Sequence, residues 1–516
     1  METSGQSINT LAGGAIIERI LARLNRIKEN GEANIRRYAR SIQIARVCRY
    51  WYQLTKPDLM SSIYIMSTTD PKGQVRWHSN IPAIIATGME DQVRNLFISG
   101  PVITKKSTII NVLQGVGFNF LVLPRLSTLF FVECTADDRS SNYDANVTKI
   151  ASFFLRRMPQ LTRIVPSSIQ EGPDGFEPIY SKILLGFSSR MNTLTTGASM
   201  LGHNPDAAFS NLTHVSLHNT DTCITSRYSS IAPASLQSLE INKGCSMFPW
   251  DMFGDGTDHD IVFPNLEVLK LILPSRGLPF RKQKISQFRL RFPRLQFLML
   301  VGTLDSFEDM TDLIYQTPIK HLRLHDNLDR IQHLDPSYVR DLDTLTIYPS
   351  FSLEPLPVVE LDKDTSFVTM FNTPSKLTRI RLGLNTLDFP KIDTVLWHNL
   401  ADATFIVRSM ELMAISTFLT QLPRLKTFKL YTLATLSKHC EYILEPQTET
   451  ASTSLRMLYI EPAHYCSYND AWLYLMLPRL PSLNILYVPD FHKKVAKKAI
   501  DASGLHVSLI ERIPLG

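Results

Sequence analysis

Residues 292–300 read FPRLQFLML, and residues 422–430 read LPRLKTFKL, with the same spacing of apolar residues. After the proline, both follow the frame Leu-x-x-Leu-x-Leu, with one Leu-to-Phe exchange in the second stretch. Successive side chains of a strand point to opposite faces, so the fourth and sixth positions of this frame enter one core together. The third and fifth positions then lie on the other face. Each stretch therefore predicts a short strand with one apolar face. The leucine at the first position, in the turn before the strand, enters the same core.

The same frame returns along most of the chain. Clear copies begin at Leu212, Leu236, Leu266, Leu295, Ile319, Leu342, Leu377, Leu425, Leu455 and Leu483. Weaker copies begin at Val93, Leu126, Leu161, Met191 and Leu400. The mean step is about 28 residues, inside the range of about 20–29 that is typical of leucine-rich repeats. A single unit cannot bury its apolar edge, whereas stacked units share one continuous core.

The repeat predicts an α/β fold, a leucine-rich-repeat solenoid over residues 66–488 with parallel strands on the concave side and helices on the convex side. The helical spacing of residues 146–161 places Ile150, Phe153, Phe154 and Met158 on one stripe. Proline precedes the strand in several units and indicates where a helix ends. These sites are 123–126, 158–161, 263–266, 292–295, 422–425 and 477–480. A large α/β enzyme with leucine-rich strands is the alternative, but a doubly wound sheet does not require one frame fifteen times.

Composition argues against several classes of protein. The net charge of +6 over 516 residues is too small for a nucleic-acid-binding protein. The 6 cysteines lie far apart, which favours thiols in a reducing compartment over a zinc site or a secreted scaffold. The N-terminus lacks the features of a signal peptide. We therefore expect an intracellular protein, cytoplasmic or nuclear, that binds neither membrane nor nucleic acid.

The sequence carries no motif typical of a catalytic or nucleotide-binding site. The sequence has no Gly-rich phosphate loop, no G-x-S-x-G and no H-E-x-x-H. We expect no catalytic residue, no metal and no cofactor, and hence no enzyme. A GTPase-activating or enzymatic solenoid has no motif in its favour.

The ends of the chain differ from the repeats. AIIERILARL at 15–24 has helical spacing, and a second helical segment follows near residues 42–51. A solenoid needs a cap on its exposed end. We predict a disordered terminus over 1–10, a helical cap over 11–65 and a C-terminal cap over 489–516, where HKKVAKKAID is an amphipathic helix.

The stretch from about residue 10 to 65 resembles the F-box, with IIERILARL followed by VCRYW at 47–51. The repeats behind it resemble those of irregular, fungal-type F-box proteins with leucine-rich repeats. The resemblance implies docking on the Skp adaptor of a cullin ubiquitin ligase. The residues it would assign to the helical core and the adaptor surface are Ile16, Ile17, Ile20, Leu21, Leu24, Val47 and Trp51.

Cationic and aromatic residues gather at the third and fifth frame positions of the later repeats, or just beyond them. The candidates for holding a protein substrate on the concave face are His321, Arg323, Tyr348, Arg379, Arg381, Lys429, Tyr431, Tyr459 and Tyr487. Arg323, Arg379 and Arg381 would pair with an acidic or phosphorylated segment. Alternatively, these are simply solvated side chains. The sequence thus predicts a non-catalytic substrate receptor of a ubiquitin ligase, or a repeat scaffold with no ligase link.

Overall fold

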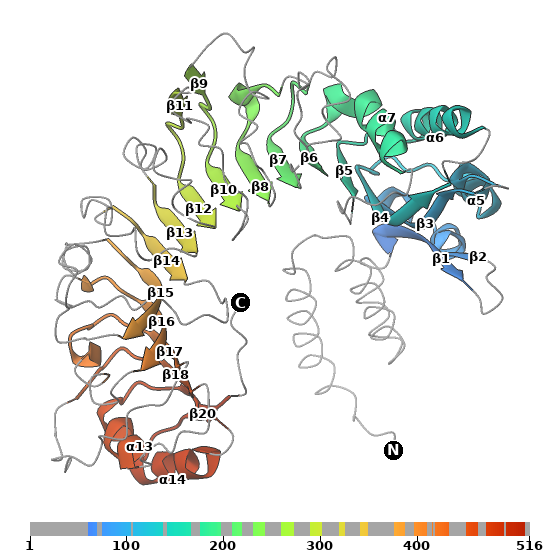
Figure 1. Cartoon of the computed structure of the whole chain (residues 1–516). Helices are drawn as coiled ribbons and strands as arrows, with labels where there is room; N and C mark the ends of the chain where they lie inside the picture. The colour runs from blue at the N-terminus through green and yellow to red at the C-terminus, as the bar shows by residue number, and fades with distance from the viewer. Residues whose placement is uncertain are drawn as a thin grey trace, which may run out of the picture. The chain divides into compact units, whose positions relative to one another are not determined.

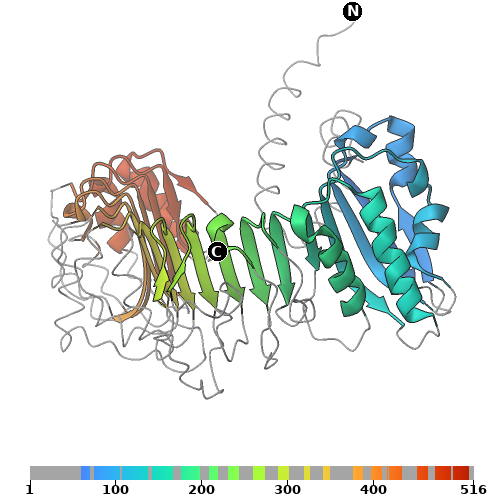
Figure 2. The same ribbon diagram turned by 90° about the horizontal axis from the view of Figure 1, so that it is seen from above.

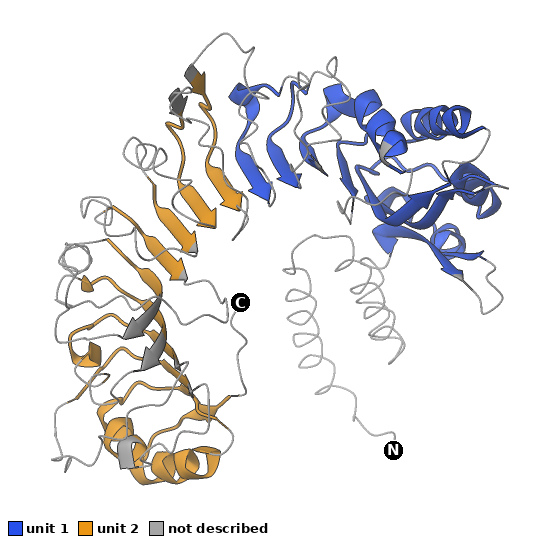
Figure 3. Cartoon of the chain, in the orientation of Figure 1, with its two compact units in different colours: residues 1–258 blue, residues 259–516 orange. Residues whose placement is uncertain are grey.

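The structure is a computed structural model that describes most of the repeat region. The described residues are 60–69, 75–104, 107–137, 142–166, 176–197, 209–218, 231–242, 260–272, 289–301, 319–325, 341–348, 376–386, 397–409, 415, 418–432, 450–462, 471–489 and 492–510. The chain divides into two compact units, residues 1–258 and residues 259–516 (Figure 3). All the adaptor-binding candidates, and the predicted cap before Met60, lie outside the described residues.

Unit 1 is built on parallel strands that pair in the order of the sequence (Figure 1). A hairpin strand, β2 (Val75–Ser79), runs antiparallel to the first of them. The parallel strands are β1 (Ser62–Thr69), β3 (Asn95–Ile103), β4 (Thr128–Ala136), β5 (Arg163–Pro166), β6 (Thr193–Gly197), β7 (His214–His218) and β8 (Ser238–Asn242). Parallel neighbours need crossover connections, which matches a repeat unit of strand plus return segment.

Helices fill the return segments of the first repeats. They are α4 (Ile81–Thr87), α5 (Ile109–Gly115), α6 (Tyr143–Arg157) and α7 (Glu177–Phe187), with 3₁₀ turns η1 (Glu90–Gln92), η2 (Phe118–Phe120), η3 (Ser188–Arg190) and η4 (Pro233–Ser235). Helices α6 and α7 lie side by side along the strands (Figure 2). The predicted stripe of α6 is confirmed, because Ile150, Phe153, Phe154 and Met158 are all buried. The ring of Phe154 meets Phe131 of β4 edge-on, with centroids 6.0 Å apart.

Unit 2 repeats the parallel order. Its strands are β10 (Val268–Ile272), β12 (Phe297–Val301), β13 (His321–His325), β14 (Thr344–Tyr348), β15 (Arg379–Thr386), β16 (Asp402–Ser409), β17 (Thr427–Thr432), β18 (Met457–Pro462), β19 (Ile485–Tyr487) and β20 (Ser508–Leu509). At its C-terminal end α13 (Ala471–Met476) and the 3₁₀ turn η12 (Leu477–Arg479) pack against α14 (Lys493–Ser503). The amphipathic helix predicted near residues 492–501 is therefore confirmed, with Ala496, Ala499 and Ile500 on its buried side.

The leucine frame accounts for the core. All fifteen predicted frames form a parallel strand, and the first, fourth and sixth positions of the clear copies are buried. The structure adds one frame to these fifteen. Its first position is Met60, and Ile63 and Ile65 of β1 are fully buried. The first parallel strand thus begins within the segment that resembles the F-box.

Two of the six prolines do not follow a helix, which corrects the prediction. Before 263–266 and 292–295 stand β9 (Asp260–Val262) and β11 (Arg289–Arg291), which pair in parallel. Burial alternates along the residues before Pro264, since Ile261 and Phe263 are buried and Val262 is 44% exposed. Such alternation suits a half-buried strand. The prediction holds at 158–161, where α6 ends at Arg157.

Candidate protein-binding face

The third and fifth frame positions share one face of each sheet, which we call the outer face; the leucines form the core face. In unit 2 the fifth positions of five consecutive strands stand in one line. Register pairs Arg323 with Thr346, Thr346 with Arg381, Arg381 with Thr404, and Thr404 with Lys429. These five residues are named the cation row. Cations and threonines alternate along it, so that a positive side chain recurs on every second strand.

The three cations of the row are partly buried and act on one another. Burial lowers the pKa of Arg323. Burial also lowers the pKa of Arg381, where Tyr431 opposes the shift and Arg323 adds a smaller lowering. The pKa of Lys429 is lowered by burial and by the guanidinium of Arg381, against the opposing carboxylate of Asp402. Arginine keeps its proton in proteins, so the repulsion remains. An anion on the row would reduce this repulsion and would find donors already held in place.

Arg379 belongs to the neighbouring line of third positions, not to the cation row. Its Nε and Nη2 donate to Oδ2 of Asp402 at 3.3 and 3.2 Å. The pair is solvent-accessible, with side-chain exposures of 65% and 37%. Sequence reasoning grouped Arg379 with Arg323 and Arg381, but Asp402 already compensates much of its charge. His321 is also on this line, where its ring lies 6.5 Å from that of Phe297.

Three of the four candidate tyrosines lie on the outer face but are not exposed, which corrects the expectation for them. Tyr431, Tyr459 and Tyr487 are 5%, 0% and 6% exposed. Tyr459 and Tyr487 stack at a centroid distance of 4.1 Å, and Tyr431 follows at 5.0 Å from Tyr459. Ile406 and Ile510 pack against these rings. They form a buried ladder of stacked rings at the end of the cation row. Their ring faces are therefore covered and do not contact a ligand.

The hydroxyl of Tyr459 donates to Oε2 of Glu461 at 2.5 Å. Burial and this hydrogen bond raise the pKa of Tyr459, so its hydroxyl stays protonated. The remaining candidate, Tyr348, pairs in register with His325 at the ends of β14 and β13. The side chain of Tyr348 lies outside the described residues.

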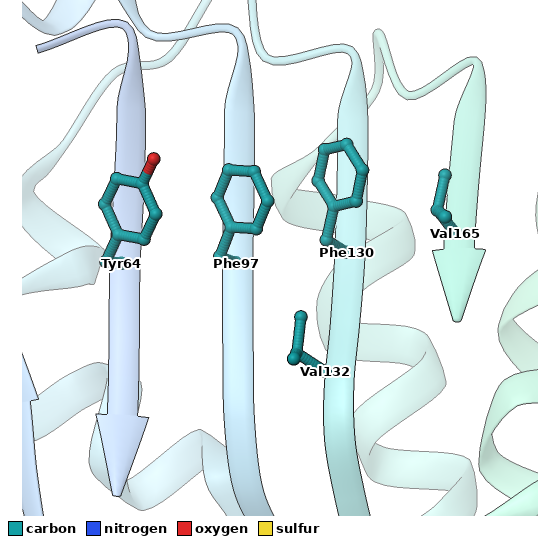
Figure 4. Close-up of a cluster of buried hydrophobic side chains, with 5 residues drawn as sticks. All are labelled: Tyr64, Phe97, Phe130, Val132 and Val165. Atoms are coloured by element: carbon teal, nitrogen blue, oxygen red, sulfur yellow. The ribbon is translucent and has the colours of Figure 1, made fainter. Parts of the chain in front are cut away.

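Unit 1 carries a second aromatic ladder on its outer face. Tyr64, Phe97 and Phe130 are in register on β1, β3 and β4, and Val165 continues the line on β5 (Figure 4). The rings stack in parallel, with centroids 4.8 and 4.3 Å apart. Phe130 takes the fifth position of the frame that begins at Leu126, which predicts this face, but only 3% of it is exposed. The alternation of residues along the strand correctly predicted the face on which Phe130 lies. It did not predict that Phe130 is buried there.

Farther along unit 1, a polar cluster joins β7 and β8. Ser216 Oγ lies 3.0 Å from Nε2 of His218, and Nδ2 of Asn242 lies 3.3 Å from Nδ1. The same Nδ2 donates to Glu240 at 2.7 Å. Since Nδ2 is a donor, Nδ1 of His218 accepts and its Nε2–H donates to Ser216. This tautomer cannot take a proton from the serine, so the geometry is that of a structural hydrogen-bond chain and not of an activated nucleophile.

Within the described part of the chain, no group of three or more His, Cys, Asp or Glu residues could hold a metal ion. Among the same residues, no helix has both the length and the apolarity needed to cross a membrane. The thiol of Cys134, which donates to the carbonyl of Ile98 at 3.3 Å, has its pKa raised to about 12 by burial. It is therefore a neutral thiol rather than a reactive thiolate.

No protein-family model matches the sequence. A search of curated proteins likewise found no match. Among solved structures, the crystal structure of a TLR13–ssRNA13 complex is similar, with 14% identity and a TM-score of 0.37. The similarity covers 77% of this chain and 58% of that chain.

Proposed function

We propose that this chain is a non-catalytic receptor that binds an acidic segment of a partner protein on the outer face of unit 2. The observation that supports it is the cation row, in which Arg323, Arg381 and Lys429 stand in register on β13, β15 and β17. Charge-assisted hydrogen bonds from arginine to carboxylate or phosphate are about twice as strong as neutral ones. Held by paired strands, these side chains lose less freedom on binding than cations on a loop.

Charge reversal on the row tests this proposal directly. Phage-displayed random peptides are selected on the purified full-length chain, on Arg323→Glu/Arg381→Glu and on Arg294→Glu/Arg424→Glu. The second variant changes net charge equally but places it at exposed positions ahead of the strands, where the two arginines contact Asn265 and Asn399. Acidic sequences should be enriched by the wild type and the second variant and lost by the first. Equal enrichment by all three proteins would refute binding at the row.

We propose further that the N-terminal segment attaches the receptor to the Skp adaptor of a cullin ubiquitin ligase. The support is the F-box resemblance of residues 10–65, and the direct passage of that segment into the first repeat at Met60. Such a receptor works by raising the concentration of its bound partner near the ligase. Cytoplasm or nucleus is the location this function requires.

The adaptor proposal is tested by a pull-down of the full-length chain with purified Skp adaptor. Wild type and Arg424→Asp should bind, and Leu24→Asp should not. Folding of each protein is checked by circular dichroism. A folded wild type that fails to bind would leave a repeat scaffold without a ligase link, and the proposal for the cation row would still stand on its own test.

A further inference from the structure

The spacing of the cation row sets a length scale for its ligand. Neighbouring strands of a sheet are about 4.8 Å apart, so cations on every second strand recur at about 9.6 Å. From Arg323 on β13 to Lys429 on β17 the row crosses four strand steps, or about 19 Å. Thr346 and Thr404 fill the intervening strands and offer hydroxyl groups between the charges.

Only one common backbone conformation of a peptide presents side chains on one of its faces at intervals of about 9.6 Å. A polyproline II helix has three residues per turn and rises about 3.1 Å per residue, so positions i, i+3 and i+6 share a face at about 9.3 Å. In an extended strand, residues two apart share a face, at about 6.6 Å. In an α-helix, residues seven apart share a face, at about 10.5 Å. Three such residues span about 21 Å, about 2 Å longer than the cation row.

We infer that the ligand of the cation row is a polyproline II segment with acidic side chains at every third residue, lying across the strands from β13 to β17. This inference rests on the proposed function and specifies the class of partner. Three acidic residues span about 18.6 Å in this conformation, close to the length of the row. A polyproline II segment is also preformed, so that little entropy is lost on binding.

The register test uses three fluorescein-labelled peptides of identical composition. They are PPEPEPEPP, PEPPEPPEP and EPPPEPPPE, each with three glutamates and six prolines, and with acidic spacings of two, three and four. Length, charge and polyproline II content are thereby matched. Binding to the full-length chain is measured by fluorescence anisotropy at about 50 mM salt, where screening is modest.

The peptide with spacing three should bind about tenfold more tightly than either of the others, which corresponds to about 1.4 kcal/mol. Arg381→Ala removes the central cation and should abolish the preference. Arg379→Ala, one line away on the same strand, is the matched control and should retain it.

Two results would overturn the inference while leaving the proposed function intact. One is equal binding of all three peptides that is lost in Arg323→Glu/Arg381→Glu; the other is a preference for spacing two or four. A nine-residue oligouridylate that displaces the peptides and binds more tightly than each would overturn the assignment to a protein segment. Failure of all acidic peptides, with no acidic enrichment in the phage selection, would overturn both proposals.

Discussion

The fifth position of the repeat has opposite roles in two regions of the molecule, the first strands of unit 1 and the middle strands of unit 2. On β1, β3 and β4 it holds Tyr64, Phe97 and Phe130, which stack in register and are almost wholly buried. On β13 and β15 it holds Arg323 and Arg381, which are partly exposed and raise the local positive charge. Both sets lie on the face away from the leucine core. The repeat frame therefore decides which face a side chain occupies, and the identity of its neighbours decides whether that face becomes core or binding surface.

The largest expected effect is the loss of a ladder ring. Phe97→Ala removes a ring stacked on both sides and should lower the free energy of unfolding of unit 1 by about 3–5 kcal/mol. Arg323→Ala, at the same frame position of unit 2, should cost less than about 1 kcal/mol, because its charge is accessible to water. Urea unfolding monitored by hydrogen exchange assigns each loss of stability to its unit. Similar losses for the two variants would contradict the distinction.

The tyrosine ladder in unit 2 shows that the distinction is not simply one unit against the other. Tyr459 shares its register line with Lys429, yet it is fully buried. Tyr459→Phe keeps the ring and removes the hydroxyl that donates to Glu461, and should cost about 1 kcal/mol. Tyr474→Phe is the control, since its side chain is 40% exposed, and it should have no measurable effect. An equally small effect of both variants in chemical denaturation would mean that the ladder is held by stacking alone.

The sequence predicted the fold because the repeat frame fixes which side chains of each strand point into the core and which point away from it. Leucines at fixed intervals specify the core face of every strand, and even the weak frames at Met191 and Leu400 form strands in register. Burial on the outer face depends on contacts between side chains far apart in sequence. Nothing local to Tyr459 distinguishes it from an exposed tyrosine, whereas the structure places it between Tyr431 and Tyr487.

The ion pair between Arg379 and Asp402 likewise could not be predicted from the sequence. Asp402 lies in a weak frame, and its contact with Arg379 follows only from the register of β15 with β16. Alternation did identify Arg323, Arg381 and Lys429 as sharing a face. What it could not supply was the strand order that turns them into a row of regular spacing.

The smallest predicted effect concerns the polar end of unit 1, where the fifth positions change from aromatic rings to Ser216 and Glu240. Burial lowers the pKa of His218 in the folded chain, and Glu240 opposes this shift. Below the ordinary value of about 6.5, the unfolded chain takes up a proton that the folded chain resists. The free energy of unfolding should therefore fall as pH decreases from about 7.5 to 5.5, and the contribution is intact only above the unfolded pKa.

His218→Asn should reduce this pH dependence, which is measured as the change in urea midpoint of unit 1 across that range. Glu240→Gln should act in the opposite sense, because loss of the carboxylate lowers the pKa of His218 further and extends the window in which only the unfolded chain is protonated. An unchanged slope in both variants would show that His218 is not the group that resists protonation. Opposite changes would show that His218, with Glu240 opposing the shift, is the group that resists protonation in the folded chain.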